Sequence, residues 1–254
     1  MSGAALVLLP GLGGDEAMWR EELEALAPWS PHVSDVHMRH PTLPEMAAAL
    51  LARHPGPLLL CGASMGGMVA LEAARQAPHR IRALALLGTT ARPESAEARR
   101  AREQAIALFD QGRVAEVIEP NAALAFHPSH AHDTARVRRY ADMVLRAGAA
   151  QLARQNRAVL ARPDARPHLP TLRCPTLVMC GQDDPITPPE CAREIAALVP
   201  GAELVLLPHC GHLLTMEQPQ AVSAHLRRWL ARLETWEPAR QRSGPAPASK
   251  RVTG

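Results

Sequence analysis

The chain has 254 residues, of which 47% are hydrophobic and 21% charged, an ordinary globular composition with enough apolar material for one large core. The formal net charge of +3 comes from residues 237–254, which hold four basic residues and one glutamate, so the rest balances at 24 basic and 24 acidic residues. This balance gives no basic face and excludes an obvious nucleic-acid-binding surface.

The five cysteines form no CxxC pair and no metal-ligand spacing, which is typical of reduced, buried thiols in a cytoplasmic protein. The apolar run Ala4–Leu9 is too short for a signal peptide or a membrane span, so we expect no membrane association. Three histidines, His127, His130 and His132, lie close together without a cluster of carboxylates or cysteines nearby. We expect them to occupy a solvated loop, and we expect no metal and no cofactor.

Short apolar runs alternate with helical patterns along most of the chain. The strand-like runs are Ala4–Pro10, Val33–Met38, Leu58–Gly62, Ile81–Gly88, Pro175–Gly181 and Ala202–Pro208. The helical patterns between and after them are Glu16–Leu26, Leu43–Arg53, Met65–Gln76, Pro189–Leu198 and Gln218–Leu233. Buried parallel strands are continuously apolar because helices cover both faces of their sheet. The alternation therefore predicts an α/β protein with a doubly wound, mostly parallel sheet.

One region, from Thr90 to His168, contains no strand candidate. Its amphipathic helical patterns are Glu94–Asp110, Val114–Ala125, Thr134–Arg146 and Ala149–Leu160. An insertion after the fourth strand candidate would lie above the carboxyl ends of the strands, where ligands bind in such sheets. We predict a core of residues 1–89 and 169–236, a helical cap of residues 90–168 and a disordered tail of residues 237–254. A helical subdomain that serves only packing is the alternative.

The first loop that follows a strand candidate is Pro10-Gly11-Leu12-Gly13-Gly14. Glycines allow this backbone to approach a ligand closely, and we predict that the Leu12 N–H is one donor of an oxyanion hole. A plain glycine turn is the alternative. The spacing does not match the G-x-G-x-x-G of a dinucleotide site, because position 16 is Glu16.

The strongest catalytic signal is Gly62-Ala63-Ser64-Met65-Gly66-Gly67, which lies between a strand candidate and a helical pattern. A G-x-S-x-G sequence in this context is a nucleophile elbow, whose tight turn leaves no room for side chains beside a strained serine. The following helix directs its N-terminal amides at a developing oxyanion. We predict Ser64 as the nucleophile and the Met65 N–H as the second oxyanion donor, with a simple glycine-rich turn as the alternative.

A serine hydroxyl needs a base, and the base needs a carboxylate to orient it. Among twelve histidines, His212 is favoured because it follows the last strand candidate and precedes the final helix, with His209 as the second choice. The segment after the fifth strand candidate supplies Asp183 and Asp184. The residues themselves leave both open as the acid, although Asp183 could instead cap the turn through its backbone.

The segments PGLGG, GASMGG, GQDDPITP and CGH together resemble the α/β-hydrolase superfamily over residues 4–233. GQDDPITP is similar to the family's G-x-x-D-x-x-x-P acid loop, and this register implies Asp184 as the acid. The order of serine, acid and histidine also matches the family. The pattern G-L-G-x-D-x-x-M-W and the segment that begins the cap are similar to small-cap bacterial carboxylesterases and 3-oxoadipate enol-lactonases. Pro10 stands where many relatives carry a histidine.

The resemblance implies hydrolysis of a small carboxylic ester or lactone through a Ser-His-Asp triad and an acyl-enzyme. Serine at position 64 disfavours a dehalogenase, whose family members carry aspartate there. The alternatives are hydrolysis of a carbon–carbon bond, or a non-catalytic ligand-binding or receptor protein of the same fold. We expect Ile186 and Leu213 to line the substrate pocket and Trp19, with Met18, to line its entrance; a place in the helix core is the alternative for Trp19 and Met18. The expected partner is a small molecule, and the sequence does not indicate an oligomeric state.

Overall fold

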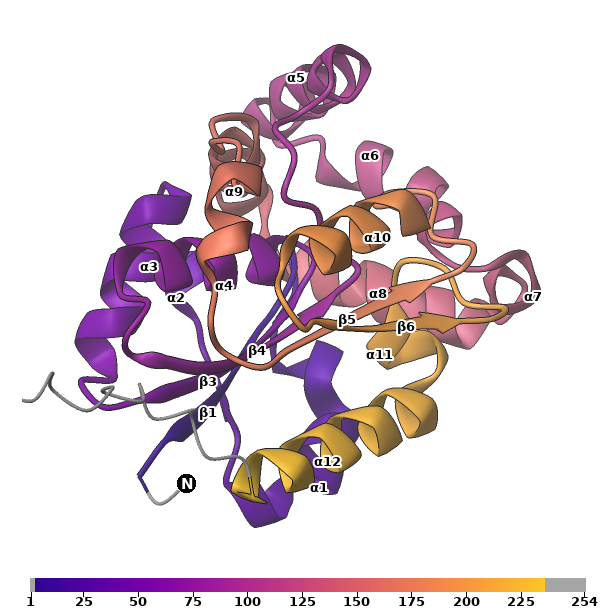
Figure 1. Ribbon diagram of the computed structural model, residues 1–254. Helices are drawn as coiled ribbons and strands as arrows, with labels where there is room; N and C mark the ends of the chain where they lie inside the picture. Colours follow the sequence, from indigo (N-terminus) through magenta and orange to yellow (C-terminus); the bar gives the residue numbers. More distant parts are fainter. Residues whose placement is uncertain (1–2, 236–254) are drawn as a thin grey trace, which may run out of the picture.

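The computed structural model describes residues 3–235, so the predicted disordered tail lies outside the described residues. Six parallel strands form one sheet in the order β2-β1-β3-β4-β5-β6. The strands are β1 (Ala5–Leu9), β2 (His32–Val33), β3 (Leu58–Ala63), β4 (Ile81–Leu87), β5 (Thr176–Gly181) and β6 (Glu203–Leu207). Helices cover both faces (Figure 1), which confirms the predicted α/β fold class.

The helices divide into those of the cap segment, residues 90–168, and those of the core, with which we group η4 because it ends beyond that segment and leads into β5. The core holds η1 (Glu16–Trp19), α1 (Arg20–Ala25), η2 (Ala27–Trp29), α2 (Val36–Arg39), α3 (Leu43–Arg53), α4 (Met65–Gln76), η4 (Arg166–Thr171), α10 (Pro189–Leu198), α11 (Leu214–Glu217) and α12 (Pro219–Thr235). The segment 90–168, called the cap below, holds α5 (Ala96–Asp110), α6 (Val114–Asn121), η3 (Ala122–Ala125), α7 (Pro128–Ala131), α8 (Thr134–Ala147) and α9 (Ala149–Leu160).

The sheet separates two hydrophobic cores because successive strand side chains point to opposite faces. In β1, Leu6 and Leu8 pack in one core, toward α1 and α12, which lie side by side in Figure 1. Val7 and Leu9 pack in the other, with residues of α3, α4 and α10. All four side chains are buried. A strand buried on both faces reads as a continuous apolar run, which is why the sequence pattern located β1 correctly.

The predicted strand Val33–Met38 is wrong beyond its first residue. Only His32 and Val33 pair with β1, and the chain then forms the helical turn α2. The carboxylate of Asp35 binds Arg39 four residues later, at 2.6 Å, an ion-pair spacing that stabilises a helical turn.

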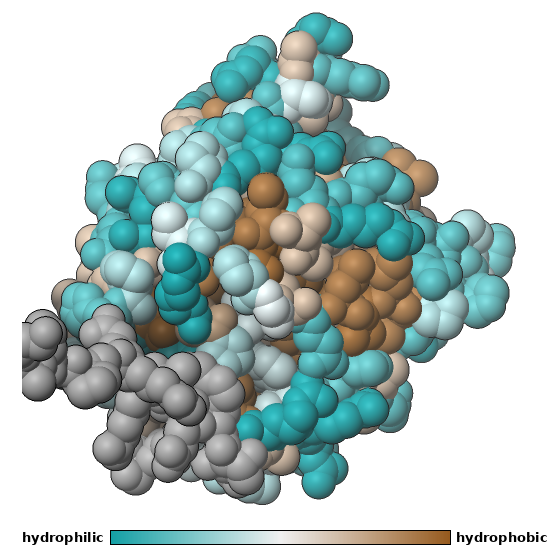
Figure 2. Space-filling model, in the orientation of Figure 1, coloured by the Kyte–Doolittle hydropathy of each residue, from teal (hydrophilic) through white to brown (hydrophobic). Residues whose placement is uncertain are grey.

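Apolar side chains are mostly held in the two cores. Figure 2 shows hydrophilic residues over most of the visible face and an apolar patch over the region of β6, the edge strand of the sheet. Leu204, Val205 and Leu206 of this strand are partly exposed. Among residues 3–235, none of the helices is both long enough and apolar enough to cross a membrane.

One carboxyl group is buried beneath the sheet without a cationic partner in the described part of the chain. Glu22 of α1 is 0% exposed and lies in the layer where α1 packs on α12. Burial penalises the charged form and raises the pKa of Glu22 from 4.5 to about 8. The folded protein therefore holds a proton at neutral pH that the unfolded chain has released.

We expect the free energy of unfolding to fall as pH rises from about 4.5 to about 8, because the folded state binds more protons in this window. At about 1.4 kcal/mol per pKa unit, the loss is on the order of 5 kcal/mol. Glu22→Gln should remove this slope, whereas Glu21→Gln, at a half-exposed neighbour, should keep it. Urea unfolding at several pH values measures both; parallel pH dependences for the wild type and Glu22→Gln would contradict the assignment.

The strand order reverses between β1 and β3, since β2 lies on one side of β1 and the chain then crosses to β3 on the other. The loop after β1 carries Gly11 and Leu12, and the turn after β3 carries Ser64. Ligands bind outside the carboxyl ends of strands at such a reversal. The topology thus brings these two loops to one place.

Candidate active site

Ser64 occupies a strained turn between β3 and α4. Its backbone has φ 51° and ψ −115°, a conformation that residues with side chains rarely adopt. A Cβ on Gly62 would lie 2.4 Å from the oxygen of Gly66, and a Cβ on Gly66 would lie 2.1 Å from the oxygen of Leu9. Both positions therefore require glycine, and the turn holds the Ser64 side chain at the carboxyl edge of the sheet.

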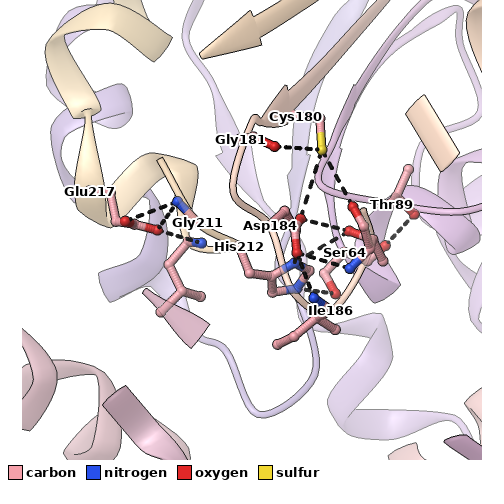
Figure 3. A network of polar contacts seen from close by, with 11 residues as sticks. Ser64, Thr89, Cys180, Gly181, Asp184, Ile186, Gly211, His212 and Glu217 are labelled. Carbon is pink, nitrogen blue, oxygen red and sulfur yellow. Dashed lines mark hydrogen bonds and ion pairs between the residues drawn. The ribbon is translucent and has the colours of Figure 1, made fainter. Parts of the chain in front are cut away.

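His212 lies between Ser64 and Asp184 (Figure 3). Its Nε2 is 3.0 Å from the Ser64 Oγ, and its Nδ1 is 2.9 and 3.1 Å from the two Asp184 carboxylate oxygens. The His212 side chain is 7% exposed and that of Asp184 is fully buried. When its Nδ1–H donates to the Asp184 carboxylate, the imidazole presents an unprotonated Nε2 that can accept from the serine hydroxyl. Ser64, His212 and Asp184, which come from separate loops, thus form one continuous chain of hydrogen bonds.

Asp184 is held by its own loop. The backbone N–H groups of Ile186 and Thr187 donate to its Oδ1 at 2.8 and 2.9 Å, and the Thr187 hydroxyl donates to Oδ2 at 2.8 Å. Burial by itself would raise the pKa of Asp184, but the charge and hydrogen bond of His212 and the donors of Thr187 lower it below its usual value. The carboxylate therefore stays ionised, as an orienting acid requires.

Asp183, the other sequence candidate, points elsewhere. Its side chain is 47% exposed, and its Oδ2 lies 3.6 Å from the Nε2 of His127. His209, the second choice for the base, has an exposed side chain and a ring 5.6 Å from that of His127. The structure thus brings His212 and Asp184 together and leaves the other two candidates outside this chain of hydrogen bonds.

One buried side chain of the cap forms hydrogen bonds with the loop after β1 and with the backbone of α2. Gln155 of α9 is 0% exposed; its Oε1 accepts from the Gly13 N–H at 2.8 Å, and its Nε2 donates to the His37 carbonyl at 3.1 Å. A Cβ on Gly13 would lie 2.9 Å from Val144 of α8. The loop that carries Leu12 is therefore packed and hydrogen-bonded against the cap.

A second buried side chain joins the cap to the loop that carries His212. The Glu217 carboxylate, fully buried, accepts from the N–H groups of Gly211 at 3.0 Å and of His127 at 2.8 Å, and lies 2.9 Å from the Nδ1 of His130. The His212 N–H itself donates to the Ala125 carbonyl at 2.8 Å. His127 and His130 are thus mostly enclosed at this junction, whereas His132 is exposed, so the expected solvated loop is found for His132 and not for the other two.

A cavity of about 170 Å³ opens beside the Ser64 hydroxyl. Its lining residues are mainly aliphatic: Gly11, Leu12, Met18, Ala63, Ser64, Leu87, Arg102, Tyr140, Ile186, His212, Leu213, Leu214 and Thr215. Ile186 and Leu213, which the sequence analysis proposed for a substrate pocket, are among these lining residues. Trp19 is not: it is 0% exposed and packs in the core with α12, whereas its neighbour Met18 lines the cavity.

The predicted oxyanion donors lie on either side of Ser64, the predicted nucleophile. Leu12 lines the cavity next to Ser64, and Met65 is the first residue of α4, with its side chain buried away from the cavity. The sequence prediction did not include Thr187, although a threonine three residues after an aspartate signals a hydrogen-bonded turn. It also missed Arg102, Gln155 and Glu217, for which helical periodicity gives no signal of function.

Comparison with known proteins agrees with this architecture. A family model described as the alpha/beta hydrolase fold matches residues 28–219. The chain is 31% identical over 252 residues to the pimeloyl-(acyl-carrier protein) methyl ester esterase of Aromatoleum aromaticum, covering 87% of this chain and 95% of that protein.

Two solved structures are also similar. A thermophilic esterase from Thermogutta terrifontis superposes with a TM-score of 0.81 at 30% identity, over 91% of this chain and 90% of the esterase. An enol-lactonase from Burkholderia xenovorans LB400 superposes with a TM-score of 0.80 at 23% identity, over 91% of this chain and 92% of the lactonase, and supports the fold. From the sheet, the elbow and these matches together, the chain belongs to the α/β-hydrolase fold family.

Proposed function

We propose that this enzyme is an ester hydrolase that cleaves small carboxylic esters through an acyl-enzyme on Ser64. The observation that carries the proposal is the chain of hydrogen bonds beside the cavity: the His212 Nε2 lies 3.0 Å from the Ser64 Oγ, and the His212 Nδ1 lies 2.9 Å from the Asp184 Oδ2. Two of the similar proteins are named as esterases, which supports the choice of an ester bond.

In the first half of the reaction, the Ser64 Oγ attacks the ester carbonyl carbon while its proton moves to the His212 Nε2. Asp184 stabilises the imidazolium that forms. The carbonyl oxygen becomes an oxyanion, for which the N–H groups of Leu12 and Met65 are the donors in this proposal, and the N-terminal dipole of α4 adds to their field. His212 then returns the proton to the alcohol as the carbon–oxygen bond breaks, which leaves the acyl group on Ser64.

The second half repeats these steps with water in place of the serine. His212 takes a proton from the water as its oxygen attacks the acyl carbon, and then gives that proton to the Ser64 Oγ as the acyl–oxygen bond breaks. The carboxylic acid leaves, and the serine hydroxyl is restored. A lactone would follow the same steps, except that its alcohol stays attached to the acyl group.

The size and lining of the cavity limit the acyl group. A volume of about 170 Å³ lined mainly by aliphatic side chains favours short or medium acyl chains, since each buried methylene contributes about 0.8 kcal/mol until the walls are reached. Beyond that length, overpacking costs more than burial returns.

We therefore expect kcat/KM on p-nitrophenyl esters to rise from acetate, reach a maximum at short to medium chain length and fall steeply toward palmitate. Steady-state hydrolysis of a series from two to sixteen acyl carbons measures this profile. A profile that still rises at palmitate would contradict an enclosed cavity. The complete absence of turnover across the series would instead favour a non-catalytic ligand-binding protein and overturn the proposed function.

A further inference from the structure

Arg102 of α5 carries the only permanent charge among the residues that line the catalytic cavity. Its side chain is 26% exposed, while the lining around it is mainly aliphatic. Tyr140, beside it in the lining, is neutral, because burial raises the pKa of its phenol to about 12. A guanidinium at this position is unexpected for a pocket that would bind only apolar acyl chains, since desolvating a charge is costly.

The positive charge of Arg102 is not cancelled by its ion-pair partner. Arg102 Nε donates to Glu94 at 2.6 Å, but the same carboxylate also accepts from Nη1 and Nη2 of Arg162, at 2.9 and 3.3 Å. Burial by itself would raise the pKa of Glu94, but the hydrogen bonds from the two arginines lower it, so Glu94 is ionised. Two guanidinium groups thus share one carboxylate, and the cluster of Arg102, Arg162 and Glu94 keeps one net positive charge.

Of the two arginines, only Arg102 can offer this charge to a ligand. The Arg162 side chain is 6% exposed, is absent from the lining of the cavity, and also donates to the backbone carbonyls of Arg92 and Val159 at 2.8 and 2.9 Å. Arg162 therefore neutralises Glu94 in a buried pair, and the excess charge lies on Arg102.

The Arg102 guanidinium is held in one orientation with one nitrogen free. Its Nη1 donates to Asn156 Oδ1 at 2.9 Å, and the Asn156 amide is itself anchored by its donation to the Leu152 carbonyl at 2.8 Å. Arg102 Nη2 has no hydrogen-bond partner within residues 3–235. A guanidinium fixed through Nε and Nη1 loses little freedom when its remaining N–H groups bind a carboxylate.

We propose that Arg102 forms an anion subsite in the catalytic cavity, so that the preferred substrate is a small ester carrying a second, free carboxylate. The inference rests on the proposed ester hydrolysis and names its substrate class. A carboxylate that binds Arg102 Nη2 gains a charge-assisted hydrogen bond and meets the unbalanced charge of the cluster. The ester carbonyl of the same molecule would then lie toward Ser64, across the aliphatic part of the lining.

The test compares matched pairs of substrates on the unaltered enzyme. Monomethyl esters of dicarboxylic acids with four to eight carbons are paired with methyl esters of the monocarboxylic acids of equal length. A second set pairs acetate esters of hydroxy acids with acetate esters of the matching alcohols, which places the carboxylate in the alcohol part. We expect kcat/KM for the charged member to exceed that of its neutral partner by about 10-fold or more at the best length in one of the two sets.

Arg102→Met should lower this charged-to-neutral ratio by about 10- to 100-fold, the usual effect of losing a hydrogen bond to a charged group. Arg102→Lys should lower the charged-to-neutral ratio less than Arg102→Met does, because lysine keeps the positive charge but lacks the planar guanidinium that is held in one orientation. The matched control is Arg99→Met, on the same helix but exposed and outside the cavity lining; its ratio should equal that of the wild type.

A wild-type enzyme that hydrolyses neutral esters with no preference for charged ones in either set would overturn the anion subsite and leave the ester hydrolase intact. An equal loss on charged and neutral esters in both Arg102 variants would assign Arg102 a purely structural role and also overturn it. Absence of turnover on every ester, p-nitrophenyl acetate included, would overturn the proposed function and the subsite together.

Discussion

Ser64→Ala is expected to abolish ester hydrolysis, with a loss in kcat of about 10⁴- to 10⁶-fold, as large as the loss of the nucleophile causes in other serine hydrolases. The variant loses the atom that forms the acyl bond, while the turn around it stays intact. Alanine fits the site because the side chain at position 64 is already small, and the glycines that permit the turn remain. Hydrolysis of p-nitrophenyl acetate measures the loss.

A covalent probe tests the same residue independently of turnover. A serine-directed fluorophosphonate should add one label to the wild-type protein, detected by mass spectrometry, and none to Ser64→Ala. Ser223→Ala is the matched control, since the Ser223 hydroxyl is buried in α12 and has no hydrogen-bond partner among the described residues. Labelling that survives Ser64→Ala would show that another residue is the nucleophile.

Asp184→Asn is expected to lower kcat by about 10⁴-fold, because an amide in place of the carboxylate favours the wrong histidine tautomer and no longer stabilises the imidazolium. The loss should appear in kcat and kcat/KM alike, since the interaction strengthens only as His212 gains its proton. The Asp184 side chain is fully buried and meets both His212 and Thr187, so no other carboxylate in the described chain can replace it there.

Asp183→Asn provides a control of identical chemistry one residue away. Its carboxylate is 47% exposed and faces His127, not His212. We expect kcat to change by no more than about 3-fold, the scale of a surface ion pair. Steady-state kinetics of the two variants, with circular dichroism to verify folding, decide between them. Similar losses, or a larger loss in Asp183→Asn, would place the orienting acid at position 183.

The cap covers the cavity and also forms hydrogen bonds with two loops of the core. Gln155 joins it to the loop of Leu12, and Glu217 joins the loop of His212 back to the cap at His127 and His130. Each of these side chains is fully buried, so neither loop can shift without breaking hydrogen bonds that have no access to water. The cap thereby holds two loops that carry proposed catalytic groups, and it also supplies Arg102.

The features of this protein that rest on short-range constraints could be predicted from its amino-acid sequence. Strands buried on both faces are continuously apolar, and a serine between glycines at the end of a strand forces a tight turn, so the sheet and the position of Ser64 were both readable. The loops of Asp184 and His212 follow strand ends, and parallel strands bring their carboxyl ends to one edge. Choosing Asp184 over Asp183 needed the family's loop pattern as well.

Which side chains of the cap and of the first helices face the cavity depends on how segments distant in the sequence pack together. Trp19 and Met18 are adjacent and both apolar, and the packing of η1 alone buries the tryptophan and exposes the methionine to the cavity. Arg102 is one of many arginines on amphipathic helices, and it differs from Arg99 only through the positions of Glu94, Arg162 and Asn156. Helical periodicity describes one helix at a time, whereas a cavity is made where several helices meet. Such contacts between distant segments leave no periodic signal in the sequence, because each depends on how the other elements pack.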